Sequence, residues 1–267
     1  MTAAIPPTEA DDVLDRQEAI AAMVQRSGRV TVELLAQQFA VTPQTIRKDL
    51  QDLQSRRRVK RVHGGAVRPS GTTNVEYDNR RRLASREKAA IAAAVAEILP
   101  DGASVFINIG TTTEAVSEAL FSHRGLMVVT NNINVADRMR HNPDAEVVIA
   151  GGVVRGSDGG IVGEAASDFI RGFKTDYAII GVSAVDEDGA LLDFDFREVK
   201  VAQAIIASAH HVILVADGQK FGRRAPVRLA HVSDIDTFVT TLAPDPIRRL
   251  CADGGTTLIE TQSERLG

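Results

Sequence analysis

The chain has 267 residues, of which 44% are hydrophobic and 25% charged, and a formal net charge of −4. This is the balance of a soluble globular protein with one large or two ordinary domains. No apolar run approaches the roughly 18 residues that span a bilayer, and the first dozen residues lack the basic start and apolar core of a signal peptide, so we expect a cytoplasmic protein.

The positive charge is concentrated near the start of the chain. Residues 26–70 contain ten basic and three acidic residues, a local charge of +7, so the rest of the chain carries −11. A basic module joined to an acidic one is typical of a DNA-binding segment attached to a domain that should not adhere to DNA.

Two helices are predicted first. An apolar spacing typical of a helix covers residues 12–26 and stops at Ser27 and Gly28. Thr31 is a candidate N-cap for the second helix. The apolar residues that we expect this helix to bury are Leu34, Leu35 and Phe39.

The third helix has the composition of a helix that reads a DNA groove. After a turn at Ala40-Val41, Thr42 caps it and Pro43 occupies its first position, where a missing N–H costs nothing. The spacing directs Ile46, Leu50 and Leu53 inward. The outer face then carries Gln44, Thr45, Arg47, Lys48 and Gln51. In a helix-turn-helix, such polar residues reach base edges, and flanking basic residues contact phosphates.

A basic run and a short hairpin follow this helix. Val59, Val62, Ala66 and Val67 can pair across Gly64-Gly65 as the wing of a winged helix. A charge run is most often a solvated face, but its place directly after a helix-turn-helix favours phosphate contact. The residues expected at the DNA interface are Thr42, Gln44, Thr45, Arg47, Lys48, Arg57, Arg58, Lys60, Arg61 and His63.

Two motifs in this segment resemble the DeoR family of bacterial transcription regulators. They are Thr-Ile-Arg-Lys-Asp-Leu at 45–50 and Arg-Val-His-Gly-Gly-Ala at 61–66, in that order after the helix pair. Members usually carry a glycine and apolar residues before the wing, where this chain has three arginines at 56–58. We therefore expect a less regular backbone path there and a stronger contact with phosphates. The winged helix-turn-helix is expected to occupy residues 12–68.

Residues 69–86 form the expected linker. Pro69–Val75 is rich in turn-forming residues and is the expected hinge, and Ser85 is a candidate N-cap for the helix that begins near Arg86. Two interpretations of the basic cluster at 80–82 remain open: it contacts either DNA or an acidic patch of the following domain.

Strands alternate with helices in the rest of the chain, and we expect this domain to occupy residues 87–250. The expected strands are 103–110, 126–130, 146–150, 177–181 and 211–217, and the expected helices 87–99, 114–120, 135–140, 164–172 and 198–208. This alternation predicts an α/β domain with a doubly wound parallel sheet. The DeoR resemblance, which covers about residues 16–243, implies a fold similar to ribose-phosphate isomerases.

Ligands of such sheets bind outside the carboxyl ends of the strands. A loop of glycine and threonines at 110–113, between a strand and a helix, is a phosphate-binding arrangement, although such loops also serve as plain turns. The residues expected to bind an effector are Asn108, Gly110, Thr111, Thr112, Thr130, Asn131, Gly151, Gly152, Asp193, Glu198 and Lys220.

Several of these assignments have a plain structural alternative. Asp193 and Asp195 alternate with phenylalanines, so they are either site residues or the polar face of a strand. Glu198 is either a ligand or part of an exposed helix start. Arg155 and Asp158 lie in a glycine-rich loop, which is either a lid or a mobile turn.

The family resemblance implies a repressor of a carbohydrate or glycerol catabolism operon. It would act on operator DNA as a homodimer or homotetramer and be relieved by a phosphorylated sugar or polyol, with glycerol 3-phosphate favoured. The alternative is an isomerase-like enzyme with an attached DNA-binding module, which would need a carboxylate base. Because a helix-turn-helix is uncommon on enzymes, we expect no catalytic residues. We also expect no cofactor and no metal, since the single cysteine, Cys251, excludes a cysteine cluster and an internal disulfide.

Overall fold

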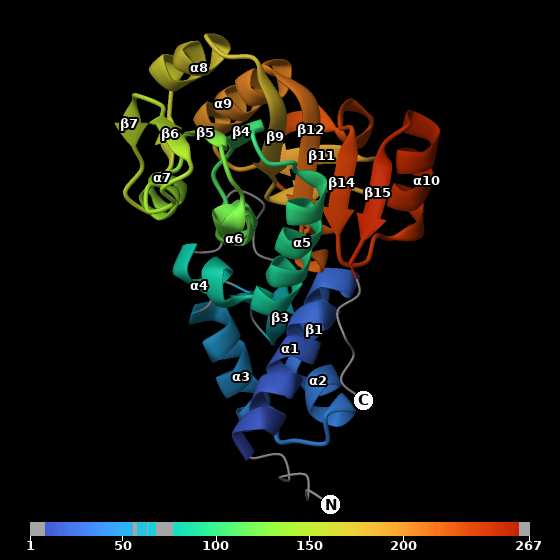
Figure 1. Cartoon of the computed structure of the whole chain (residues 1–267). Coiled ribbons are helices and arrows are strands. Elements are labelled where there is room, and N and C mark those ends of the chain that lie inside the picture. Colours follow the sequence, from blue (N-terminus) through green and yellow to red (C-terminus); the bar gives the residue numbers. More distant parts are fainter. Residues whose placement is uncertain (1–8, 56–57, 63, 68–76, 262–267) are drawn as a thin grey trace, which may run out of the picture. The chain divides into compact units, whose positions relative to one another are not determined.

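The computed structural model describes residues 9–55, 58–62, 64–67 and 77–261. Figure 1 shows the elements of the chain, which divides into two compact units between Asn79 and Arg80. Each unit has its own hydrophobic core. Within the described part of the chain, every helix is too short or too polar to cross a membrane. The predicted hinge at 69–75, Arg57 and His63 lie outside the described residues.

The first unit is a three-helix domain with a small sheet. Its elements are α1 (Glu9–Ser27), β1 (Arg29–Thr31), α2 (Val32–Gln38), α3 (Pro43–Ser55), β2 (Lys60–Val62) and β3 (Gly65–Val67). Strands β2 and β3 form the predicted antiparallel hairpin. Strand β1 was not predicted and pairs with the other side of β3. Gly65 allows this pairing, because a Cβ there would lie 2.0 Å from the Val30 carbonyl oxygen.

Local capping sets the helix boundaries of this unit. The side chain of Thr31 accepts a hydrogen bond from the Leu34 N–H, and that of Thr42 accepts one from the Thr45 N–H at 3.1 Å, which confirms both predicted caps. The inward positions predicted for α3 are also confirmed, since its apolar residues are all at most 2% exposed. The prediction for Leu34 was wrong: it is 49% exposed, because α2 directs Val32 and Leu35 inward instead.

The second unit is an α/β domain. It contains α5 (Ser85–Ile98), β4 (Ser104–Ile107), α6 (Thr111–Ala119), β5 (Met127–Thr130), α7 (Ile133–Met139), β6 (Glu146–Ile149), β7 (Val153–Val154), β8 (Ile161–Val162), α8 (Glu164–Arg171), β9 (Thr175–Gly181), β10 (Ala184–Val185), β11 (Ala190–Asp193), α9 (Phe196–Ala207), β12 (Ala209–Ala216), β13 (Val227–His231), β14 (Thr237–Thr240), α10 (Asp245–Gly254) and β15 (Thr257–Glu260). Three short 3-10 helices, at 120–122, 218–220 and 232–234, complete it among the described residues. Helix α4 (Tyr77–Arg82) precedes α5 and contains the boundary between the units.

Seven strands of this unit form one parallel sheet. Their order is β15-β14-β12-β9-β4-β5-β6, and all six neighbouring pairs are parallel. The chain proceeds from β4 outward to β6, then crosses to β9 and proceeds outward in the opposite direction to β15. The order therefore reverses between β4 and β9, and their carboxyl ends are where a doubly wound sheet places its ligands.

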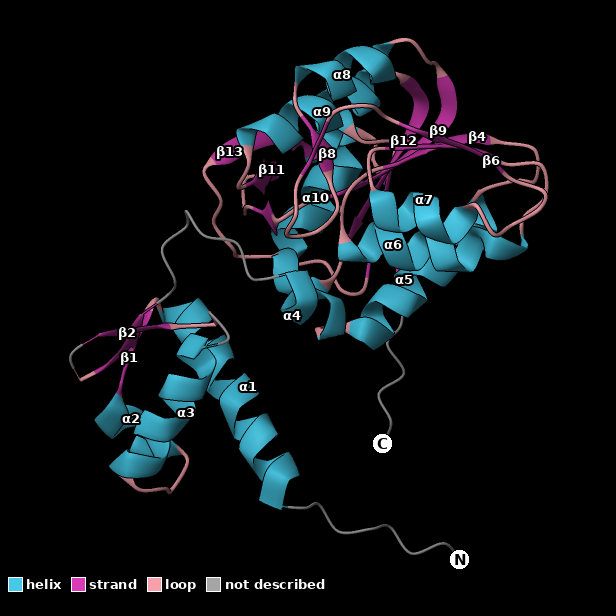
Figure 2. Ribbon diagram, turned by 90° about the vertical axis from the view of Figure 1, so that its left-hand side faces the viewer, coloured by secondary structure: helices cyan, strands magenta, loops and turns pink. Residues whose placement is uncertain are grey.

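Helices cover both faces of this sheet (Figure 2). One core contains residues of α5, α6 and α7, and the other contains residues of α8, α9 and α10. The strands supply both cores by alternation: Ile213 and Val215 of β12 belong to the first, Leu214 and Ala216 to the second. The predicted parallel, doubly wound α/β fold is confirmed.

Four details of this unit differ from the predictions. Ser85 is not an N-cap: Ala84 caps α5 in a left-handed conformation (φ 53°) and its carbonyl accepts from the Lys88 N–H. Helix α6 begins at Thr111, three residues before the predicted start. An antiparallel sheet, β10-β11-β13, was not predicted. The main sheet continues through β15, past residue 250 where we expected the domain to end.

Candidate functional sites

The outer face of α3 is a polar, cationic surface. Gln44, Arg47, Lys48 and Gln51 are exposed, and Thr45 is partly buried with its hydroxyl 2.9 Å from that of Thr42. These residues line an open hollow of about 830 Å³ together with Arg61 of the hairpin and residues of α1. Six residues that we expected at a DNA interface therefore lie together around this hollow. They are Thr42, Gln44, Thr45, Arg47, Lys48 and Arg61.

An ion pair between α1 and α3 lies at the edge of this surface, and Arg16 and Asp49 also line the hollow. Asp49 of α3 is 2% exposed and accepts hydrogen bonds from Arg16 Nε at 2.7 Å and Nη2 at 3.2 Å, and from Gln17 Nε2 at 3.2 Å. The pair ties α3 to α1 and offsets a carboxylate that would otherwise oppose an approaching phosphate. Sequence reasoning missed it, because the partners are 33 residues apart.

The arginine run ends in a contact inside the domain. Arg58 donates to both carboxylate oxygens of Glu18 in α1, at 2.9 and 3.0 Å, and its side chain is 18% exposed. Lys60 and Arg61 are exposed. In this structure Arg58 therefore supports the base of the hairpin, whereas Lys60 and Arg61 present charge to solvent.

The second site lies at the switch point of the parallel sheet. Gly110 follows β4 and is the N-cap of α6, with φ 150° and ψ 150°, a conformation that favours glycine. The Thr113 hydroxyl donates to the carbonyls of Asn108 and Gly110, both at 2.7 Å, and so closes the loop. Thr111 and Thr112 are buried in the first turn of α6. Their N–H groups belong to the helix end that attracts anions.

Asparagines follow the next strand, β5. The Thr130 hydroxyl donates to the Ile107 carbonyl at 2.6 Å and accepts from the Asn132 N–H at 3.0 Å. Asn131 is fully buried, and its Oδ1 has no partner among the described residues. Asn132, which we did not predict as a site residue, donates to Glu114 of α6 at 3.1 Å. The ends of β4 and β5 are thus joined by hydrogen bonds.

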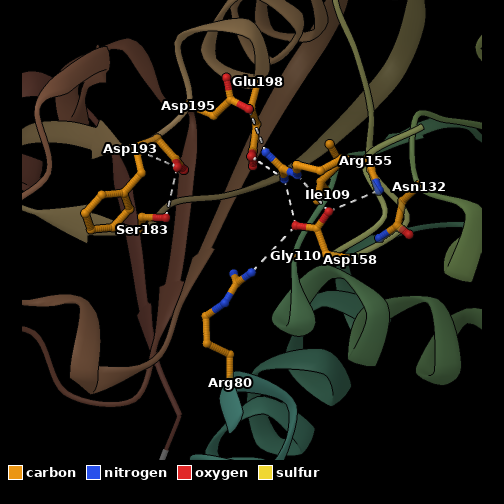
Figure 3. A network of polar contacts seen from close by, with 12 residues as sticks. Arg80, Ile109, Gly110, Asn132, Arg155, Asp158, Ser183, Asp193, Asp195 and Glu198 are labelled. Atoms are coloured by element: carbon orange, nitrogen blue, oxygen red, sulfur yellow. Dashed lines mark hydrogen bonds and ion pairs between the residues drawn. The ribbon is translucent and has the colours of Figure 1, made fainter. Parts of the chain in front are cut away.

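Arg155 is the centre of a charged network near the Gly110 loop (Figure 3). It donates to Asp158 at 2.7 and 2.8 Å, to Asp195 at 3.0 Å and to Glu198 at 2.6 Å. Burial and the charge of Asp193 raise the pKa of the Glu198 carboxyl, against the opposing effect of Arg155. The loop of Arg155 and Asp158 is therefore tied to the start of α9 by ion pairs, and Glu198 is not part of an exposed helix start.

The neighbouring acidic residues are held by local contacts. Asp193 ends β11, is 4% exposed, and accepts from the Ser183 hydroxyl at 3.0 Å. Asp195 caps α9 by accepting from the Arg197 N–H at 2.9 Å. Neither carboxylate lies on an exposed strand face, because Asp193 is buried at the end of β11 and Asp195 is the N-cap of α9.

Three further cationic side chains belong to this region: Arg80 in α4, Lys88 in α5 and Lys220 in the 3-10 helix after β12. Arg80 of α4 lies 3.6 Å from Asp158 in an ion pair. Lys88 of α5 is buried and donates to the carbonyls of Arg80 and Leu83, the latter at 2.6 Å, and burial lowers its pKa. Burial and the charge of Arg223 lower the pKa of Lys220 to about 7. Sequence reasoning singled out Lys220 but not Lys88. For Arg80, the ion pair with Asp158 agrees with the second of the two interpretations of the cluster at 80–82, contact with acidic residues of the following domain.

Two predicted site residues lie apart from this network. Gly151 and Gly152 are exposed between β6 and β7. A Cβ at Gly152 would meet the Ile161 side chain at 2.9 Å and the Val162 carbonyl oxygen at 3.4 Å. The strand ends that meet the network are those of β4, β5, β11 and β12.

Both units match protein-family models. A DeoR-like helix-turn-helix domain matches residues 16–72, and a DeoR C terminal sensor domain matches residues 83–241. The chain belongs to the DeoR family. It is therefore a DNA-binding transcription regulator with an N-terminal reading domain and a C-terminal sensor domain.

Curated relatives are similar across both domains. The glycerol-3-phosphate regulon repressor of Escherichia coli (strain K12) is 45% identical over 87% of this chain and 92% of its own length. That of Haemophilus influenzae is 45% identical over 91% and 95%, and the repressor CsqR of E. coli is 35% identical over 93% and 96%. A solved ribose 5-phosphate isomerase from Methanocaldococcus jannaschii aligns over 52% of this chain and 55% of its own, with 12% identity and a TM-score of 0.39, too low to bear on chemistry.

Proposed function

We propose that this protein is a transcriptional repressor of a carbohydrate or glycerol catabolism operon, released from its operator by a phosphorylated sugar or polyol. Glycerol 3-phosphate is the favoured effector. The observation that carries the proposal is the combination of two features in one chain: an exposed cationic α3 surface, and a buried site that joins a helix N-terminus with cations at the switch point of the sheet. Similarity to glycerol-3-phosphate regulon repressors over both domains supports it.

At the DNA, α3 enters the major groove. Gln44 and Thr45, near its N-terminus, are placed to reach base edges, while Arg47, Lys48 and Arg61 contact phosphates. Operators of such domains carry paired half-sites about one helical turn apart, so the protein acts as a homodimer or homotetramer in the cytoplasm.

In the sensor domain, the effector's phosphate docks against the first turn of α6 at Gly110, Thr111 and Thr112, and its charge is balanced by cations that include Lys220. Its hydroxyls meet the polar side chains around it, including Asn108, Asn131, Asp193 and Glu198. Binding must favour an arrangement of the protein with lower operator affinity, because an effector shifts an equilibrium only by its differential affinity for the two states.

The test is operator binding under titration with candidate effectors. A DNA fragment selected by the full chain from a random pool serves as the operator, and fluorescence anisotropy follows its release by a panel of sugar phosphates and glycerol 3-phosphate. Glycerol and inorganic phosphate are the matched controls. Release by a phosphorylated polyol at concentrations where both controls are inert supports the proposal. If no phosphorylated compound alters operator affinity, the sensor model is wrong, although DNA reading remains.

Catalysis is the competing use of the same groups. An isomerase needs a free carboxylate base beside its substrate. Of the three candidates, Asp195 and Glu198 are held by Arg155 and Asp193 accepts a hydrogen bond from Ser183. We therefore propose a sensor rather than an enzyme. Incubation of the purified chain with ribose 5-phosphate and triose phosphates tests this, and robust turnover would overturn the ranking.

A further inference from the structure

Arg80 stands at the junction between the linker and the sensor domain, and the domain holds it at both ends. Its backbone carbonyl, with that of Leu83, accepts a hydrogen bond from the buried Lys88 Nζ. Its guanidinium forms the ion pair with Asp158, and its side chain is 16% exposed. Arg80 therefore joins α4, which lies within the expected linker at 69–86, to the sensor domain at two points, its backbone and its guanidinium.

The charge around Arg80 suits an anion. Burial lowers the pKa of both the Lys88 and the Lys220 amines, and the charge of Arg80 adds to this while that of Asp217 opposes it. Figure 3 shows the guanidinium directed at Asp158, beside the Gly110 loop. A phosphate beside Arg80, Lys88, Lys220 and the α6 N-terminus would be attracted by these positive charges, and it would compete for them with the carboxylates of Asp158, Asp193 and Asp217.

Of the two ion pairs that Asp158 forms, the one with Arg80 is longer than the one with Arg155. Asp158 Oδ2 lies 2.7 Å from Arg155 but 3.6 Å from Arg80. A dianionic phosphate offers three strong acceptors, and guanidinium–phosphate hydrogen bonds are among the strong ones in proteins. Arg80 can exchange Asp158 for a phosphate while Asp158 keeps its shorter contacts with Arg155.

We propose that Arg80 is a ligand of the effector's phosphate and that its exchange of Asp158 for the phosphate transmits occupancy of the sensor domain to the linker through α4. This rests on the proposed function, because it requires a phosphorylated effector. It adds a binding residue outside the predicted site and a physical connection from that site to the DNA-binding domain.

Binding and coupling give two separate readouts. Loss of a hydrogen bond to a charged group weakens binding by roughly 10- to 100-fold. Arg80→Gln should therefore lower the affinity for glycerol 3-phosphate by that factor. The affinity for inorganic phosphate, measured by competition, should fall by a similar factor. Effector and operator affinities in the wild type should be coupled by a factor of about 5 to 150, and in Arg80→Gln this factor should approach one.

The experiment uses the full chain in four forms: wild type, Arg80→Gln, Arg80→Lys, and Arg86→Ala as a control. Arg86 is an exposed arginine in the first turn of α5. Calorimetry measures effector affinity with and without saturating operator, and the ratio is the coupling factor. Arg86→Ala should match the wild type. Arg80→Lys, which keeps the charge but not the fork of donors, should recover part of the affinity and also reports on the site if Arg80→Gln fails to fold.

The outcomes separate the two proposals. If the wild type binds none of the phosphorylated compounds, the proposed sensor function fails and this inference fails with it. If the wild type responds and Arg80→Gln retains both affinity and coupling, only the role of Arg80 is overturned. If Arg80→Gln loses affinity for glycerol 3-phosphate but keeps the wild-type coupling factor, transmission through α4 is wrong.

Discussion

The two units hold their charged side chains in opposite ways. The α3 surface presents Arg47 and Lys48 to solvent. Asp49, a buried carboxylate of the same helix, forms an ion pair with Arg16 of α1. In the sensor domain, Arg155 is shared among Asp158, Asp195 and Glu198 inside the protein. A surface that meets a permanent polyanion needs exposed cations, whereas a site that must respond reversibly holds its cations in ion pairs with which a ligand competes.

The largest effect should come from the centre of the sensor network. Replacing Arg155 with methionine leaves three carboxylates without their shared cation, and breaking a buried ion pair costs about 3–5 kcal/mol. Urea unfolding of the C-terminal unit measures this loss. Arg171→Met is the control, because Arg171 and Asp168 are both more than half exposed and such pairs contribute about 0–1 kcal/mol. Equal free energies of unfolding for the two variants would mean that the ion pairs of Arg155 do not stabilise the domain.

The corresponding change in the reading domain is Arg16→Ala. It leaves Asp49 buried without its cation, and we expect a loss of about 3 kcal/mol in the stability of that domain together with weaker operator binding. Adding Asp49→Asn removes the uncompensated charge and should restore a large part of the stability. If the double variant is no more stable than Arg16→Ala, packing rather than charge explains the contact between α1 and α3.

A smaller effect, confined to DNA, is expected at Arg47. Arg47→Ala should weaken operator binding by about 1–3 kcal/mol, roughly 10- to 100-fold, while effector binding by the sensor domain stays unchanged. Anisotropy with the selected operator and calorimetry with the effector measure the two affinities. Arg29→Ala, an exposed arginine of β1 in the same domain, is the control and should change operator affinity less. Unchanged operator affinity in Arg47→Ala would show that another element enters the groove.

The features that could be predicted from the sequence are those whose signals lie close together in the chain. Helix α3 was predictable because its signals are local: Thr42, Pro43 and the spacing of Ile46, Leu50 and Leu53 all act within one helix. The parallel sheet was predictable because strands alternate regularly with helices, and the loop after β4 because strand, glycine and threonines are contiguous.

The missed features depend on distant partners. Arg155 finds Glu198 43 residues later, and Arg16 finds Asp49 33 residues later. Strand β1 is three residues long and is defined only by its pairing with β3. The left-handed Ala84 has no side-chain signal, so the adjacent Ser85 was wrongly predicted as the cap. Local patterns therefore predicted where the candidate sensor site lies, but they did not identify the ion pairs around it.

An effect that appears only as a pH dependence of effector binding is expected at Lys220. Burial and Arg223 hold the pKa of Lys220 at about 7, with Arg80 adding to this and Asp217 and Asp193 opposing it. Above that pH the free site contains a neutral amine, so a bound phosphate must first recruit a proton. The second ionisation of a phosphate lies near pH 6, so the ligand's charge is nearly constant from pH 7 to 9. Affinity should therefore fall by up to about tenfold per pH unit over this window.

Lys220→Met separates this origin from others. It should bind the effector more weakly than the wild type at pH 7 but show a flatter profile up to pH 9. The same shift has the opposite sign for folding. Because the pKa of Lys220 is lower in the folded than in the unfolded chain, the cost of burying its charge is fully present below pH 7 and is relieved as the pH rises towards 10.5. A wild-type affinity that is constant from pH 7 to 9 would show that Lys220 does not face the phosphate, and would leave Arg80 and the α6 N-terminus to balance its charge.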